Sequence, residues 1–176
     1  MMSGKARLVF SLTFVFYILP LLLFIPSIPA QELQKDAQYQ NEKGIEYFNK
    51  GFYEALPKKK KEEASRYFEQ AGAAFKKAIA LNKSDVDAHR NLARVYYVQK
   101  RFSAAALEYL KVTDLVPTDI DAYVLSALAY TKAKDYEQAM AQLKTAKTFT
   151  ADQAVIQKLD DYLSKIEQKK GSQSEE

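Results

Sequence analysis

The sequence predicts an all-α fold, an α-α superhelix of stacked helix-turn-helix repeats, from three observations. Residues 86–119 and 120–153 carry matching residue types at a shift of 34 positions, which is typical of a stacked repeat array. The matched pairs include Asp87 with Asp121, Ala93 with Ala127, Tyr96 with Tyr130 and Ala105 with Ala139. Within each stretch the apolar residues recur at spacings of three and four, as on one face of a helix. Pro117 closes the first stretch, because proline lacks an amide proton and clashes with the preceding helical turn.

The N-terminal residues 1–30 have the layout of a secretory signal peptide. Lys5 and Arg7 precede the uncharged apolar run 8–25, and PSIPA follows before the polar QELQKD. A basic start, an apolar middle and a small-residue end predict cleavage after Ala30. The alternative is an uncleaved membrane anchor, since a bilayer-spanning helix needs roughly 17–25 apolar residues. We therefore expect an exported protein, periplasmic or secreted, or else one held at a membrane by residues 8–25.

Residues 34–85 predict a first repeat that carries an insertion at about residues 54–67. Gly44 takes the small position of its first helix, and Gly51 takes the position of the usual turn. From Phe68 onward the second helix is in register with the later repeats. The insertion is expected to lengthen the turn between the two helices.

The lysine run Lys58–Lys61 lies in this insertion and has two interpretations. We expect the second helix to gain extra turns at its start, from about Lys58. The lysines then either face water beside Glu62 and Glu63, or contact an anionic surface such as membrane headgroups. The sequence leaves both interpretations open.

The part of the chain after the third repeat predicts a capping helix over residues 154–169. Its apolar residues on one side are Val155, Ile156, Leu159, Tyr162, Leu163 and Ile166. Because the end of a stacked array exposes an apolar face, a terminal helix that covers this face is the expected solution. The polar residues 170–176 predict a disordered tail.

The repeats resemble the tetratricopeptide repeat (TPR), whose signature is a set of small and large residues over 34 positions. In residues 86–119 the matching positions are Leu92, Ala93, Tyr96, Phe102, Ala105, Tyr109, Val112 and Pro117. In residues 120–153 they are Ala127, Tyr130, Tyr136, Ala139, Leu143 and Ala146, with Tyr123 in place of the usual tryptophan. The chain departs from the pattern at Ser126, where leucine is expected, and at Ala151, where proline is expected. The resemblance implies a TPR solenoid of three repeats and a capping helix.

Residues that could carry chemistry are scarce. His89 is the single histidine, and the absence of cysteine excludes disulfides, a thiol nucleophile and a thiolate metal site. We expect His89 to pack at a repeat junction. The glycines are too scattered for a phosphate loop, and the adjacent Asp160 and Asp161 would point apart on a helix. We expect no enzyme activity, no cofactor and no metal, and the net charge of +4 gives no argument for a nucleic-acid partner.

The resemblance places the first helix of each repeat on the concave side of the superhelix. The inward positions are then Asn41, Ile45, Phe48, Asn49, Arg90, Arg94, Tyr97, Val98, Val124, Leu128, Thr131 and Lys132. Arg90 and Arg94 stand four apart on one helical face, where they either suit a carboxylate-bearing peptide or simply face solvent. Of the TPR residues that clamp chaperone C-termini, Asn91 alone falls on a matching position, so that activity is not expected.

The function implied by the resemblance is a scaffold or adaptor that binds a protein or peptide segment in its concave groove. The alternative is a structural subunit of a larger envelope or membrane complex that docks through outer faces or repeat ends. The sequence leaves the partner's identity and the oligomeric state open. Membrane contact through residues 8–25 is expected only if that segment stays uncleaved.

Overall fold

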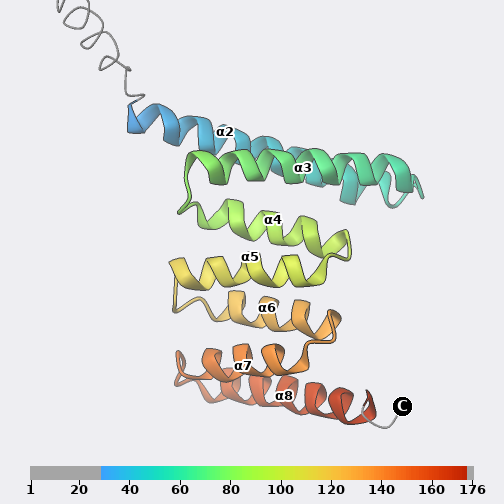
Figure 1. Ribbon diagram of the computed structural model, residues 1–176, viewed down its shortest axis with the longest axis vertical. Helices are drawn as coiled ribbons and strands as arrows, with labels where there is room; N and C mark the ends of the chain where they lie inside the picture. Colours follow the sequence, from blue (N-terminus) through green and yellow to red (C-terminus); the bar gives the residue numbers. More distant parts are fainter. Residues whose placement is uncertain (1–28, 174–176) are drawn as a thin grey trace, which may run out of the picture.

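The computed structural model describes residues 29–173, and the elements of that range are helices, which confirms the all-α class (Figure 1). In chain order they are α2 (Ala30–Asn49), the π-helical segment η1 (Lys50–Ala55), α3 (Lys61–Leu81), α4 (Val86–Val98), α5 (Phe102–Leu115), α6 (Ile120–Lys132), α7 (Tyr136–Lys147) and α8 (Gln153–Gln173). Between residues 29 and 173, no helix combines the length and the apolar character that crossing a bilayer requires. The apolar run 8–25, predicted as a signal peptide or anchor, lies outside the described residues.

The helices stack in sequence order as three pairs followed by α8 (Figure 1). α2 packs on α3, α4 on α5 and α6 on α7, and the second helix of each pair also packs on the first helix of the next. α8 packs on α7 and closes the array. This arrangement is the superhelix of helix-turn-helix repeats that the 34-residue period predicts.

Short turns of the same geometry join the two helices of the second and third repeats. Lys100 and Lys134 have positive φ angles of 60° and 64°. The amide after each lysine donates to a carbonyl five residues back, Arg101 to Tyr96 at 2.8 Å and Asp135 to Tyr130 at 2.9 Å. These bonds satisfy carbonyl groups that the end of a helix otherwise leaves without partners.

Aspartate side chains cap the starts of four helices, and at α8 the carboxylate of Asp152 accepts from the amides of Ala154 and Val155 at 2.8 and 3.4 Å. Asp85 at α4, Asp119 at α6 and Asp135 at α7 each accept a hydrogen bond from the backbone amide three residues later, at 2.9, 3.0 and 3.2 Å. A cap of this kind contributes roughly 0.5–2 kcal/mol. The caps therefore fix where α4, α6 and α7 begin.

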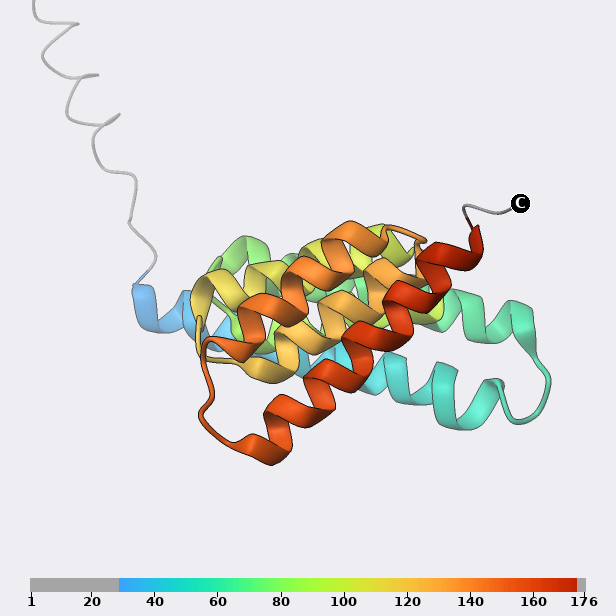
Figure 2. The ribbon, with the colours of Figure 1, turned by 90° about the horizontal axis from the view of Figure 1, so that it is seen from below.

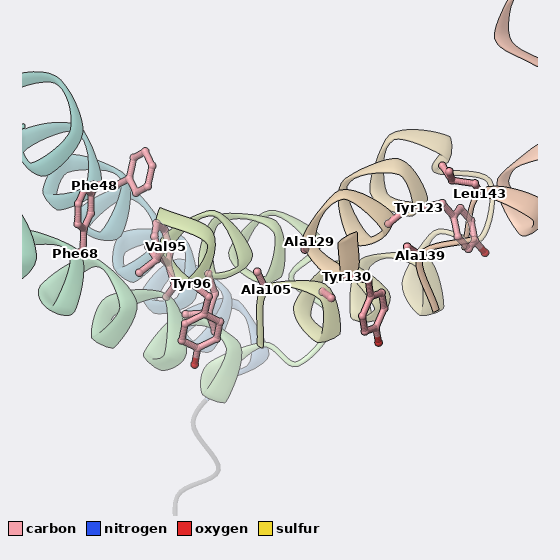
Figure 3. Packing of buried hydrophobic residues seen from close by; sticks show 14 of the residues in the cluster. Phe48, Phe68, Val95, Tyr96, Ala105, Tyr123, Ala129, Tyr130, Ala139 and Leu143 are labelled. Atoms are coloured by element: carbon pink, nitrogen blue, oxygen red, sulfur yellow. The ribbon is translucent and has the colours of Figure 1, made fainter. Parts of the chain in front are cut away.

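Small residues lie where helices cross, and large rings fill the space beside them (Figure 3). Ala105 and Ala139 are fully buried, and Tyr96 belongs to the same apolar core. In the first repeat the small residue is Gly44, where a Cβ atom would lie 2.5 Å from Cε1 of Phe75. Only glycine leaves room for the Phe75 ring to pack directly on the α2 backbone.

The insertion in the first repeat differs from the expectation. The chain does not turn at Gly51, because α2 continues through η1, and α3 begins at Lys61 rather than Lys58. Gly51 has no positive φ angle, and a Cβ atom there would lie 2.9 Å from Cε1 of Phe68. This glycine therefore admits the Phe68 ring instead of turning the chain. The added residues lengthen both helices, and the α2–α3 hairpin projects beyond the rest of the stack (Figure 2).

The end of the chain also differs from the expectation, since α8 continues to Gln173 beyond the predicted end at residue 169. Lys170, assigned to a disordered tail from the sequence, forms an ion pair with Glu137 of α7. Leu159 and Ile166 of α8 are buried against the third repeat. The polar residues at 170–173 continue a helix that packing has already formed, so their composition does not end it.

Candidate functional site

A pocket of about 370 Å³ opens between the first helices of the three repeats, and we call it the aromatic pocket. Its lining residues are Phe48, Phe52, Arg94, Tyr97, Val98, Tyr109, Leu125 and Leu128. Of these, Phe48, Arg94, Tyr97, Val98 and Leu128 are residues that the sequence placed on the concave side. Apolar side chains dominate the lining, with one cation among them.

Ring contacts hold the walls of the aromatic pocket. Phe48 stacks on Phe52 of η1, with ring centroids 5.6 Å apart and planes 10° from parallel. Tyr97 meets Phe102 edge to face at 5.3 Å. Phe52 reaches the pocket because η1 prolongs the helix of Phe48, so the continuation of α2 into η1 contributes a wall to the site.

Arg94 supplies the positive charge of the aromatic pocket. Its guanidinium carbon lies 4.8 Å from the centroid of the Phe48 ring, a cation–π geometry. Its Nη1 lies 3.5 Å from the side-chain oxygen of Asn91, at the limit of a hydrogen bond. Among the described residues no carboxylate forms an ion pair with Arg94, so its guanidinium is available to donate hydrogen bonds to an anionic partner.

Tyr109 forms the floor of the aromatic pocket and is almost fully buried. Burial raises the pKa of its hydroxyl, and the guanidinium groups of Arg94 and Arg90 partly counter that rise. The hydroxyl is therefore neutral at physiological pH, and the floor carries no negative charge against Arg94.

Arg90 does not join Arg94 in the pocket. Its Nη2 lies 2.5 Å from Oδ2 of Asp119, the residue that also caps α6. This ion pair ties the second repeat to the start of the third. Of the two interpretations left open for Arg90 and Arg94, the structure does not favour a joint contact with one carboxylate, because the Asp119 cap of α6 already binds Arg90.

A second pocket, of about 180 Å³, lies next to the aromatic pocket and shares Leu128 with it; we call it the α8 pocket. Its lining residues are Val124, Ala127, Leu128, Thr131, Leu143, Tyr162, Lys165, Ile166 and Lys169. The sequence placed Val124, Leu128 and Thr131 on this side but gave α8 only a capping role. Lys165 and Lys169 stand four apart on α8, next to the apolar side that carries Tyr162 and Ile166.

The remaining predicted groove residues lie at the edges of the site. Ile45 and Asn49 line a cleft of only about 20 Å³ beside Phe48. Asn41 accepts a hydrogen bond from the Asn91 amide at 3.2 Å, which joins α2 to α4. Lys132 is on α6 but lines neither of the two pockets.

His89 is buried at the junction of repeats. Its Nδ1 lies 2.8 Å from Oε2 of Glu108, and its Nε2 lies 3.2 Å from the carbonyl oxygen of Lys83. Both ring nitrogens therefore have protein partners. Within the described part of the chain, no group of three or more histidine, cysteine, aspartate or glutamate residues is placed to hold a metal ion.

The solved structures that this chain resembles include three TPR domains. The TPR2B domain of yeast Sti1, in complex with an Hsp70 peptide, has a TM-score of 0.58 at 22% identity. The match covers 77% of this chain and 98% of the Sti1 domain. The Arabidopsis OM64 TPR domain has a TM-score of 0.54 at 18% identity, and the match covers 76% of this chain and 98% of the OM64 domain. The first TPR of Spaghetti (RPAP3), bound to an HSP90 peptide, has a TM-score of 0.51 at 17% identity, with 73% and 93% covered.

No protein-family model matches the sequence, and comparison with curated proteins finds no match. The fold defines the chain as a helical-repeat solenoid. Its likeness to the TPR domains above makes that solenoid TPR-like.

Proposed function

We propose that this chain is a scaffold or adaptor that binds a segment of another protein along the aromatic pocket and the α8 pocket. The observation that carries the proposal is that two mainly apolar pockets lie side by side and share Leu128, and we treat them as one groove. Arg94, Lys165 and Lys169 lie along this groove, and among the described residues neither lining includes an aspartate or glutamate.

The chemistry of the groove indicates the character of the segment. Apolar and aromatic walls favour large apolar side chains as anchors, because buried anchors supply most of the binding energy in protein interfaces. Arg94, Lys165 and Lys169 favour carboxylates beside those anchors, since charge-assisted hydrogen bonds to arginine and lysine are strong. The proposed ligand is therefore an acidic segment with at least two large apolar residues.

The solved TPR domains of yeast Sti1 and Spaghetti hold chaperone peptides, which supports a peptide as the partner class. We do not propose that this chain binds chaperone C-termini. Asn91 alone matches the residues that clamp them, and here Asn91 donates to Asn41. We propose no catalytic activity.

The proposed location of the protein rests on the residue pattern of positions 1–30. We propose export with cleavage near Ala30, and retention at a membrane through residues 8–25 as the alternative. Mass spectrometry of the N-terminus of the chain purified from its own cells distinguishes the two. A mature chain starting at Gln31 supports export, whereas an intact residue 1–30 segment supports the anchor.

The second candidate is docking into a larger envelope or membrane complex through the outer face, in which case the groove is incidental. Leu107 of α5 is 57% exposed and lines none of the pockets described above. A single exposed leucine is ordinary on a protein surface, so Leu107 serves as a control position away from the groove.

The test is selection of binders from a library of random peptides by the purified chain. We expect enriched peptides to be acidic and to carry large apolar residues, and we expect Leu128→Asp and Arg94→Glu each to weaken their binding at least tenfold. Leu107→Asp is the matched control and should bind as the wild type does. Loss of binding with Leu107→Asp alone would instead favour docking through the outer face, and enrichment of basic peptides would contradict the proposed groove chemistry.

A further inference from the structure

The tip of the α2–α3 hairpin, residues 52–61, extends away from the helical stack (Figures 1 and 2). The later repeats have no counterpart, because short turns at Lys100 and Lys134 join their helices. Nothing in the packing of the stack requires a hairpin that reaches past its neighbours. The tip is therefore free to meet a surface that the rest of the molecule does not reach.

The tip presents large apolar side chains to solvent. Tyr53 is 63% exposed and Leu56 is 40% exposed. Tyr53 lies on η1 and Leu56 directly follows it, so both belong to the tip. Neither side chain lines the aromatic pocket or the α8 pocket, so both are available to a surface outside the groove.

The tip also carries four consecutive lysines, Lys58–Lys61. Lys60 pairs with Glu63 at 2.9 Å, but among the described residues no carboxylate forms an ion pair with Lys58, Lys59 or Lys61. Glu54 is the single acidic residue of the tip itself. Glu62 and Glu63 follow in the first turn of α3, where the positive end of the helix offsets their charge.

The backbone of the tip is held in place. Ala55 and Ala64 are 2% and 1% exposed, so η1 and the start of α3 pack against each other at the end of the hairpin. The amide of Leu56 donates to the Gly51 carbonyl and that of Lys60 to the Ala55 carbonyl, both at 3.0 Å. The exposed side chains therefore belong to an ordered element that presents apolar and basic groups together.

We propose that this tip docks on the surface of a bilayer rich in anionic lipids. The lysines contact the phosphate groups, and Tyr53 and Leu56 enter the interfacial region between headgroups and acyl chains. Exposed apolar residues beside Lys58, Lys59 and Lys61 on a projecting element complement such a surface in both charge and polarity. The proposal does not depend on the groove, which lies along the stack and binds a protein segment.

The chain has no tryptophan, which makes a clean fluorescence test available. Tyr53→Trp places a single tryptophan at the tip, and Tyr39→Trp places one at an exposed position of α2 away from the tip. The full chain is used for both, so that any contribution of residues 8–25 is common to them. Emission is recorded with vesicles of phosphatidylcholine alone and with vesicles that also contain phosphatidylglycerol.

We expect Tyr53→Trp emission to shift to shorter wavelength only with the anionic vesicles, and Tyr39→Trp emission to stay unchanged. High salt, or Lys58→Gln, Lys59→Gln, Lys60→Gln and Lys61→Gln together, should abolish the shift. An unchanged Tyr53→Trp spectrum overturns the proposal, as does an equal shift of Tyr39→Trp, which would mean adsorption through another face. A shift of the same size with a soluble polyanion also overturns it, because insertion of Tyr53 into lipid would then not be its cause.

Discussion

Replacing Gly44 by alanine tests the packing of the first repeat most sharply. Gly44 is buried on α2, and an alanine Cβ atom there would lie 2.5, 2.7 and 2.8 Å from three carbons of the Phe75 ring. Carbon atoms in contact normally sit about 3.5–4.0 Å apart. Phe75 is 1% exposed, so its ring has no free space into which it can retreat.

The expected effect is the difference between two terms. Overpacking a core by one methyl group costs about 1–3 kcal/mol. We expect a cost in the upper half of that range, because the added Cβ atom would lie too close to three atoms of the Phe75 ring. Alanine in place of glycine in a helix returns about 1 kcal/mol. Gly44→Ala should therefore lower the free energy of unfolding by about 1–2 kcal/mol, and at roughly 2–4 °C per kcal/mol Tm should fall by about 2–8 °C.

Gly72→Ala on α3 is the matched control. Its Cβ atom would meet Cγ1 of Val95 at 3.5 Å and Cδ1 of Leu92 at 3.9 Å, which are ordinary contacts. The same substitution should here raise the free energy of unfolding by about 1 kcal/mol. Urea denaturation followed by circular dichroism measures both, and Phe75→Leu should remove most of the cost of Gly44→Ala. A Gly44→Ala chain as stable as the wild type would refute the close packing of Phe75 on α2.

Further predictions concern the repeat boundaries and the cap. Leu159→Ala, which empties a buried site under α8, should cost about 2–5 kcal/mol in urea denaturation, and a loss below 1 kcal/mol would mean that α8 does not cover the core. Asp119→Ala should destabilise the chain more than Asp135→Ala in thermal melts, because both residues cap helices but Asp119 also pairs with Arg90; equal losses would show that the ion pair contributes nothing. Burial raises the pKa of Tyr109 above its unfolded value, so the stability it contributes is complete below about pH 10 and is lost as pH rises through the folded-state pKa. Tyr109→Phe should therefore make the decline of Tm above about pH 10 shallower, and an unchanged slope would contradict that assignment.

The fold could be predicted from the sequence because each of its determinants is local. Spacings of three and four define the helix faces, and a 34-residue shift brings Ala105 and Ala139 to equivalent crossings. Pro117 follows the end of α5, as its missing amide proton predicts. These signals act within one repeat, where sequence distance and spatial distance agree.

The site was harder to predict because its decisive contacts cross repeats. Arg90 looks like a partner of Arg94 on the helix, but its actual partner, Asp119, lies 29 residues away at the next helix start. Tyr162 was placed on the apolar side of the cap and Lys165 was given no role, whereas both line the pocket between α6 and α8. The turn expected at Gly51 was wrong because glycine reads as a turn residue, whereas here it admits the Phe68 ring.

The most direct test of the proposed groove is to map a bound peptide by nuclear magnetic resonance. The chain labelled with nitrogen-15 is titrated with the peptide that the library selection enriches most strongly, and backbone amide shifts are followed. We predict that the shifts concentrate on η1, α4, α6 and the Tyr162–Lys169 part of α8, around Leu128. Shifts confined to α3, α5 and α7, or a selection that enriches no peptide at all, would contradict a binding groove on the inner side of this solenoid.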